Sequence, residues 1–374
     1  MTDQQPSIGS TVALAKPELD GLLADLRRGG FRTVGPRARD EGIVYAEIES
    51  LADLPRGIQT AQKPASYRMT QTGQNRCFDF IPGSQSWKQF LFPPRTELFT
   101  ARKESGKWKL DENIEEQPRY AFIGVRACEL AAIEIQDRVF MRPDFTDPVY
   151  RARRAGLFIL AVNCTHPNDT CFCTSMGTGP AHKAGYDLCL TELDEVFLVQ
   201  VGSELGRSLL AKRTFDLPSA FVQKNAADAL ESAARSITRT LDTDGLPELL
   251  MDSLESGRWA EIGKRCLSCA NCTLVCPTCF CWDATDLPDL TGKTARRERV
   301  WDSCFNLQYS YMAGGNTRPT IRSRYRQWLT HKLSTWKDQF GVPGCVGCGR
   351  CITWCPASID LTEEIPALRA EVKK

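Results

Sequence analysis

Two cysteine runs with the same spacing constrain the fold of this 374-residue chain more than any other feature. They are Cys266-x2-Cys269-x2-Cys272-x3-Cys276-Pro277 and Cys345-x2-Cys348-x2-Cys351-x3-Cys355-Pro356. Three thiolates from one short loop can hold three irons of a [4Fe–4S] cube, while the fourth cysteine, before a proline, begins a segment that leads away. The sequence therefore predicts two [4Fe–4S] clusters in the C-terminal part of the chain.

The fourth cysteine of each run is expected to cross to the other cluster, as in two-cluster ferredoxins. The expected ligands are Cys266, Cys269, Cys272 and Cys355 for cluster 1, and Cys345, Cys348, Cys351 and Cys276 for cluster 2. Zinc is the alternative, because paired C-x2-C units also form zinc sites. A zinc ion needs only four ligands, however, so the third evenly spaced cysteine and the trailing Cys-Pro favour cubanes.

Composition points to a soluble globular protein in a reducing cytoplasm. The 47 basic and 46 acidic residues leave a net charge of +1, which gives no sign of a nucleic-acid partner. Seventeen cysteines are too sparse for a disulfide scaffold of this length, and eight of them already have cluster spacing. No export signal is visible at the N-terminus, and the apolar run at 157–162 is too short to span a membrane.

The apolar pattern predicts an α/β N-terminal domain followed by an α-rich, two-cluster ferredoxin-like domain. We expect a flexible tail at 1–16, the α/β domain at 17–245, and the dicluster domain at 246–374 with an insert at 282–344. A βαβ unit is expected from a strand at 121–125, a helix at 127–140 and a strand at 157–162. Other expected elements are a helix from residue 17, strands at 32–34, 43–48, 67–69, 78–81 and 195–201, and an amphipathic helix at 220–240.

A second cysteine family repeats a tetrapeptide: Thr170-Cys-Phe-Cys173 recurs as Thr278-Cys-Phe-Cys281. Cys128, Cys164, Cys171 and Cys173 lie after two neighbouring predicted strands, so they are candidate ligands of a third iron–sulfur cluster, with His166 as a weaker candidate. The alternative is that they are small buried side chains. Cys279, Cys281 and Cys304 either pack against the first cluster or bind a further cofactor, and Cys77 and Cys189 are expected in the core.

The insert carries a run of cations, at Arg318, Arg322, Arg324, Arg326 and Lys332. Three interpretations stay open: the cations raise a cluster potential, form a solvated helix face, or dock a partner with Tyr325, Trp328 and Trp336 as anchors.

A substrate-converting site is not evident in the sequence. No G-x-G-x-x-G follows a predicted strand, and no pair of C-x2-C motifs is left over for a nickel–iron centre. A chain with clusters and no substrate site is expected to conduct electrons between other subunits.

Five segments resemble one protein family: 86–94, 124–130, 136–140, 170–180 and 344–356. They look like the beta subunit of cytoplasmic NAD(P)-linked nickel–iron hydrogenases, also called sulfhydrogenases, in a family that also includes one subunit of anaerobic sulfite reductase. The resemblance runs from about Pro17 to Glu364. It implies a subunit that relays electrons between a flavoprotein NAD(P)-reductase subunit and the nickel–iron small and large subunits.

Three alternatives remain: the corresponding subunit of anaerobic sulfite reductase, a stand-alone sulfur or polysulfide reductase using Cys279 and Cys281, and a zinc-binding interaction module. The sequence leaves open the cluster potentials, the choice between NAD and NADP, and the direction of electron flow.

Overall fold

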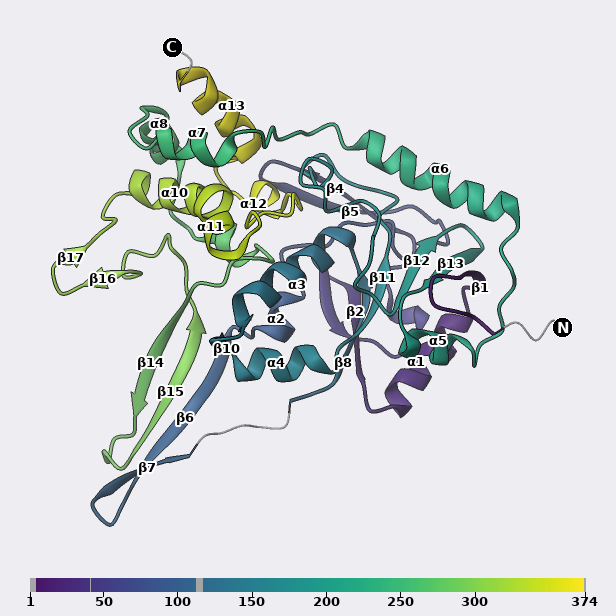
Figure 1. Cartoon of the computed structure of the whole chain (residues 1–374), viewed down its shortest axis with the longest axis horizontal. Helices are drawn as coiled ribbons and strands as arrows, with labels where there is room; N and C mark the ends of the chain where they lie inside the picture. Colours follow the sequence, from purple (N-terminus) through teal and green to yellow (C-terminus); the bar gives the residue numbers. More distant parts are fainter. Residues whose placement is uncertain (1–4, 41, 112–116, 373–374) are drawn as a thin grey trace.

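The computed structural model describes residues 5–40, 42–111 and 117–372, and its N-terminal part is built on a seven-stranded mixed sheet (Figure 1). The strand order is β1-β13-β12-β11-β8-β2-β3. The central strands β12, β11, β8 and β2 run parallel, and the outer strands are antiparallel to their neighbours. The bounds are β1 Thr11–Ala15, β2 Arg32–Arg39, β3 Gly42–Glu47, β8 Tyr120–Val125, β11 Phe158–Val162, β12 Leu188–Glu192 and β13 Val196–Val201.

The predicted βαβ unit is confirmed. Strand β8 leads into helix α3 (Ala127–Phe140), then helix α4 (Pro148–Ala155), and the chain returns in β11, which pairs parallel with β8. Alternate residues of these strands pack on opposite faces: Ile123 joins the core under α1 (Glu18–Arg28) and α5 (Glu204–Leu210), whereas Phe122 packs under α3 and α4. Every residue of β8 and β11 is buried because helices cover both faces.

Two sequence predictions are wrong in this part of the chain. Residues 11–15 belong to no flexible tail, because β1 pairs with β13 and buries Val12 and Leu14; residues 1–4 lie outside the described residues. Residues 78–81 form no strand, although Phe78 and Phe80 are buried. Their carbonyl groups accept hydrogen bonds from Arg126 instead of a neighbouring strand, so an apolar run here indicates burial and not pairing.

The C-terminal part is mainly helical and packs around Trp259, Tyr325 and Trp328. Its helices are α7 Leu246–Asp252, α8 Arg258–Arg265, α9 Asn271–Leu274, α10 Ile321–Thr330, a π-helical turn η2 His331–Thr335, α11 Trp336–Phe340, α12 Arg350–Thr353 and α13 Leu361–Val372. Helix α6 (Ala220–Ser236), four residues shorter than predicted at its C-terminal end, precedes this part. No helix within the described ranges combines the length and the apolar character needed to cross a bilayer.

A four-stranded antiparallel sheet joins the two parts and projects as an arm at the lower left of Figure 1. The insert supplies β14 (Trp282–Pro288) and β15 (Thr294–Trp301), and the N-terminal part supplies β6 (Arg95–Glu104) and β7 (Lys107–Asp111). Since β15 pairs directly with β6, the insert is partly β-structured and shares its sheet with residues that precede the predicted domain boundary.

Candidate metal centres

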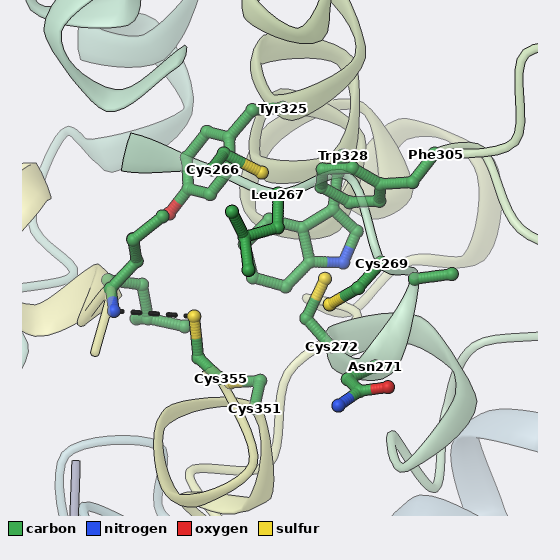
Figure 2. Close-up of a pocket in the computed structure, with 13 residues that line it drawn as sticks. Cys266, Leu267, Cys269, Asn271, Cys272, Phe305, Tyr325, Trp328, Cys351 and Cys355 are labelled. Carbon is green, nitrogen blue, oxygen red and sulfur yellow. Dashed lines mark hydrogen bonds between the residues drawn. The ribbon is translucent and has the colours of Figure 1, made fainter. Parts of the chain in front are cut away.

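The first cavity brings together the four cysteines predicted for cluster 1, and we call it site 1 (Figure 2). Cys266 and Cys269 come from the loop between α8 and α9, Cys272 lies in the first turn of α9, and Cys355 comes from the segment after α12. Aromatic and aliphatic side chains complete the wall: Phe305, Tyr325, Trp328, Ile359 and Leu361. The fold therefore brings Cys355 of the second run into the same cavity as three cysteines of the first run.

Backbone amides point at the sulfur atoms of both cysteine runs. The N–H groups of Ser268 and Ile359 donate to the Sγ atoms of Cys266 and Cys355 at 3.4 and 3.3 Å. In the second run, the N–H of Gly347 donates to the Sγ of Cys345 at 3.5 Å. Such donors stabilise thiolate charge, and hydrogen bonds to sulfur are among the features that set cluster potentials.

The indole of Trp328 offers a buried hydrogen-bond donor to any group bound in site 1. Trp328 is buried, and its Nε1–H has no hydrogen-bond partner among the described residues. Figure 2 shows this nitrogen on the side of the ring toward Cys269 and Cys272. A buried N–H donor is costly to leave unpaired, so this wall suits a group with acceptor sulfurs.

Site 2 consists of the cysteines predicted for cluster 2. Burial raises the pKa of Cys351 well above its usual value, and the nearby Cys345, Cys348 and Cys276 of site 2, together with Cys272 of site 1, raise it further. The ammonium of Lys332, buried in η2, donates to the Sγ of Cys276 at 3.3 Å and to the Gly344 carbonyl oxygen at 2.9 Å. Site 2 thus contains a buried cation in contact with a predicted ligand.

The two cysteine loops share a backbone conformation but not the same residues. Ser268 and Ala270 have φ values of +53° and +66°, and the equivalent Gly347 and Gly349 have +66° and +72°. A Cβ on Gly347 would lie 2.6 Å from the backbone of Phe172, and one on Gly349 would lie 2.2 Å from the Thr170 carbonyl oxygen. Glycine is needed in the second loop because the first Thr-Cys-Phe-Cys segment packs directly on it.

Both copies of the repeated tetrapeptide bind the second loop through their buried threonines. Thr170 hydrogen-bonds Thr353 at 2.9 Å, just beyond the loop, and Thr278 donates to the carbonyl oxygen of Gly344 at 2.6 Å, at its start. The Phe172 N–H also donates to the Gly347 carbonyl oxygen at 2.9 Å. One structural role of the repeat is therefore to fix site 2 from both sides.

Site 3 is a second apolar cavity that brings together the four N-terminal cysteines Cys128, Cys164, Cys171 and Cys173. Cys128 follows β8 and Cys164 follows β11, so the parallel pairing of these strands places both at the same edge of the sheet. Burial is the main cause that raises the pKa of each of the four thiols. Metal binding at this site would therefore release protons.

Two buried arginines line site 3. Arg126 donates to the carbonyl oxygens of Phe80 and Asn163 at 2.8 and 3.4 Å, and its Nε has no partner among the residues described. Arg350 forms an ion pair with Glu129 in which each side chain is only 2% exposed. The Arg126 charge has no carboxylate ion-pair partner in the described parts of the chain, so an anionic group fits this cavity.

Two cysteines of site 2 also face the neighbouring sites. Cys351 lines the cavity of site 1, and Cys348 lines the cavity of site 3. Site 2 therefore lies between the other two. Within the described residues, no three His, Cys, Asp or Glu side chains are grouped to hold a single metal ion; a cubane needs a wider cage, because its four thiolates bind four separate irons.

The remaining candidates lie elsewhere. His166 does not line site 3 but pairs with Asp79 at 2.9 Å. Cys77 and Cys189 are buried in the core, as predicted. Cys279, Cys281 and Cys304 line a cavity of their own beside site 2.

The cations and aromatic residues of the insert do not share a single role. Tyr325, Trp328 and Trp336 are at most 4% exposed, so the interpretation of these rings as docking anchors is wrong: they form the core around site 1 and site 2. Arg322 and Arg326 pair with Glu255 on the helix surface, whereas Lys332 contacts Cys276. The sequence could not separate them, because helical periodicity is broken by the π-helical turn that directs Lys332 inward.

Comparison with known proteins gives the family. Residues 265–359 match the family model of the 4Fe-4S dicluster domain. The chain is also 33% identical over 285 residues to sulfhydrogenase 2 subunit beta of Pyrococcus furiosus, covering 75% of this chain and 82% of that protein. The chain belongs to the sulfhydrogenase beta-subunit family. This makes it an iron–sulfur, metal-binding member of the electron-transporting oxidoreductases, and the resemblance identified from the sequence is confirmed.

No solved structure matches the chain. The family match supports an iron–sulfur dicluster region at the place where sites 1 and 2 lie.

Proposed function

We propose that the chain is the iron–sulfur electron-transfer subunit of a cytoplasmic nickel–iron hydrogenase complex and has no substrate-converting site of its own. Sites 1 and 2 would each hold a [4Fe–4S] cluster, which carries one electron reversibly, and site 3 would hold a third iron–sulfur cluster. The observation that carries the proposal is that two cysteines of site 2 line the neighbouring cavities, Cys351 that of site 1 and Cys348 that of site 3, because this supports a series of three cysteine sites.

The chain's own residues support this role. Cys269 is the one exposed cysteine of the seventeen, and Leu267 beside it is 66% exposed. We propose that this face of site 1 meets a redox partner, because an exposed ligand shortens the distance for electron transfer. None of the seventeen cysteines forms a disulfide in the structure, which is consistent with a reducing compartment such as the cytoplasm.

The proposed partners are a flavoprotein NAD(P)-reductase subunit and the nickel–iron small and large subunits. The support for them is the relative, which by its name is a hydrogenase subunit. Co-purification from the native host tests this directly. Association with a sirohaem subunit would favour the alternative, anaerobic sulfite reductase, and recovery of neither would refute a hydrogenase role.

Iron and sulfide quantitation on the anaerobically purified chain tests the number of clusters. About twelve irons are expected with site 3 filled, and about eight with two cubanes only. The variant Cys171→Ser should lose about four irons, whereas Cys189→Ser, a buried cysteine outside the three sites, should lose none. Equal iron contents in the two variants would contradict a cluster at site 3, and an iron-free chain would contradict the whole proposal.

The second candidate function is sulfur or polysulfide reduction at Cys279 and Cys281, favoured only by their position on one cavity beside site 2. Replacing both by serine should leave sulfide production of the intact complex unchanged if electron transfer is the sole role. Loss of sulfide production with full iron content would favour the second function.

A further inference from the structure

A cavity of about 150 Å³ lies beside site 2, and we call it the side cavity. Its wall contains three cysteines outside sites 1 to 3, namely Cys279, Cys281 and Cys304. It also contains the cationic side chains of Arg318 and Lys332. Thiols grouped beside a proposed cluster site can take part in redox chemistry as well as in packing.

The arm sheet places Cys281 and Cys304 together. Strands β14 and β15 pair from Trp282 to Trp301, and the Asp302 N–H continues this pairing by donating to the Cys281 carbonyl oxygen at 2.9 Å. Cys304 follows two residues later, both side chains line the side cavity, and each is the first cause of the other's pKa shift. The pair is therefore held by the end of a regular ladder and not by loop contacts alone.

The third cysteine of the side cavity is engaged elsewhere. Cys279 hydrogen-bonds Cys276 of site 2, and the carbonyl oxygen of Cys279 accepts a bond from Lys88 at 3.2 Å. Cys279 thus connects the side cavity to site 2. The pair Cys281 and Cys304 is left to react with each other.

The two paired sulfurs differ in acidity. The hydrogen bond from Cys304, together with the Tyr309 hydroxyl and the Lys332 ammonium, lowers the pKa of Cys281 to about 6 against the effect of burial. The same hydrogen bond, followed by burial, raises the pKa of Cys304. At neutral pH a thiolate therefore lies beside a protonated thiol, which is the arrangement from which disulfides form.

We propose that Cys281 and Cys304 form a redox-active dithiol that stores two electrons beside the cluster series. On oxidation the two Sγ atoms bond, the S–H bond of Cys304 breaks, one proton leaves, and two electrons pass to two oxidised [4Fe–4S]²⁺ clusters, one to each. Reduction reverses these steps. The part of this inference that names the electron acceptors rests on the proposed function, whereas formation of the disulfide does not.

The position of the pair fits a two-electron store. Lys332 contacts Cys276 and also lines the side cavity, and Trp328 lines both the side cavity and site 1. Cys272 of site 1 is among the neighbours that raise the pKa of Cys304. The dithiol therefore borders sites 1 and 2 and can exchange single electrons with each, which would couple a two-electron donor to one-electron carriers.

Differential alkylation of the full chain tests the proposal. The anaerobic protein is equilibrated with reduced or oxidised dithiothreitol, quenched in denaturant with N-ethylmaleimide and digested for mass spectrometry, with iron content measured before and after. We expect one cross-linked peptide joining Cys281 and Cys304 in the oxidised sample, and full alkylation of both after reduction. The matched control Cys189→Ser should behave as the unmodified chain.

A second readout keeps the test independent of any one variant. In coulometric titration the unmodified chain should take up two more electrons than Cys304→Ser or Cys281→Ser, at equal iron content. Alkylation of both cysteines under all conditions would overturn the inference, as would a loss of about four irons in Cys281→Ser, which would make Cys281 a cluster ligand. An iron-free chain that still forms the disulfide would reject the proposed function and leave the dithiol standing.

Discussion

Replacing Lys332 by methionine should make the potential of the cluster proposed for site 2 more negative. The Lys332 ammonium lies 3.3 Å from the Sγ of Cys276 and is fully buried. Burial lowers the pKa of Lys332, but the Cys276, Cys279 and Cys345 thiolates outweigh burial and raise it well above its usual value. The side chain is therefore a fixed positive charge, and its removal disfavours the added electron.

The size of the effect follows from this distance. A unit charge at 3.3 Å is worth about 1.3 kcal/mol at a water-like dielectric constant and about 5 kcal/mol at an effective value of 20. These energies correspond to roughly 55 and 215 mV for a one-electron couple. The added electron is spread over the cube, so its mean distance from Lys332 is larger. We therefore expect a shift of about 50 to 150 mV, in the lower part of the range between the two limits above.

A redox titration followed by electron paramagnetic resonance measures this shift. The matched control is Lys337→Met, which removes an exposed lysine one helical turn further along the chain. The control should leave all potentials unchanged. A Lys332→Met potential that moves no further than the control would refute the assignment of Lys332 as a charge partner of site 2.

Three more predictions use the same methods. Under crossed ligation Cys276→Ala should abolish the same signal as Cys345→Ala, and Cys355→Ala the same signal as Cys266→Ala; loss of the Cys266→Ala signal in Cys276→Ala would exclude crossed ligation. Glu129→Gln should lower the free energy of unfolding by about 3–5 kcal/mol, because it leaves Arg350 buried without its ion partner, and chemical denaturation showing under 1 kcal/mol would contradict this. Burial lowers the pKa of His182 to about 4, so as pH falls the imidazole is protonated in the unfolded chain before it is protonated in the folded one. The free energy of unfolding should therefore drop by about 3 kcal/mol between pH 7 and 4. Thermal melts of His182→Gln should show a smaller drop over the same pH range.

Sequence spacing predicted the elements whose patterns are local. Helix α3 begins and ends where predicted, and its flanking strands differ by one residue, since both depend on short apolar runs bounded by turn signals. The same reasoning failed at 78–81, where the buried phenylalanines belong to a loop and not to a strand. It also failed at 11–15, where a short alternating segment forms a strand by pairing with residues 196–200 of β13.

The side chains that contact the cysteine sites could not be predicted from local sequence patterns. The ion pair of Arg350 with Glu129 joins residues 221 positions apart, and it passes between the second cysteine loop and helix α3. The pairing of β15 with β6 also joins distant parts of the chain, because Thr294 lies opposite Arg102. Cys304 and Cys281, in contrast, are brought together by the local pairing of β14 with β15. No periodicity encodes such contacts, because they arise when separate elements pack.

The sequence by itself determined the spacing of the cysteines in two loops and so predicted which of them hold cubanes, because ligand spacing within a tight turn is a local geometric requirement. Only the tertiary structure decided that four N-terminal cysteines share a cavity, that Cys351 and Cys348 of site 2 line the cavities of sites 1 and 3, and that Lys332 turns inward onto Cys276. These features depend on burial and on charge at distances of a few ångströms, which are set by packing between elements far apart in the chain.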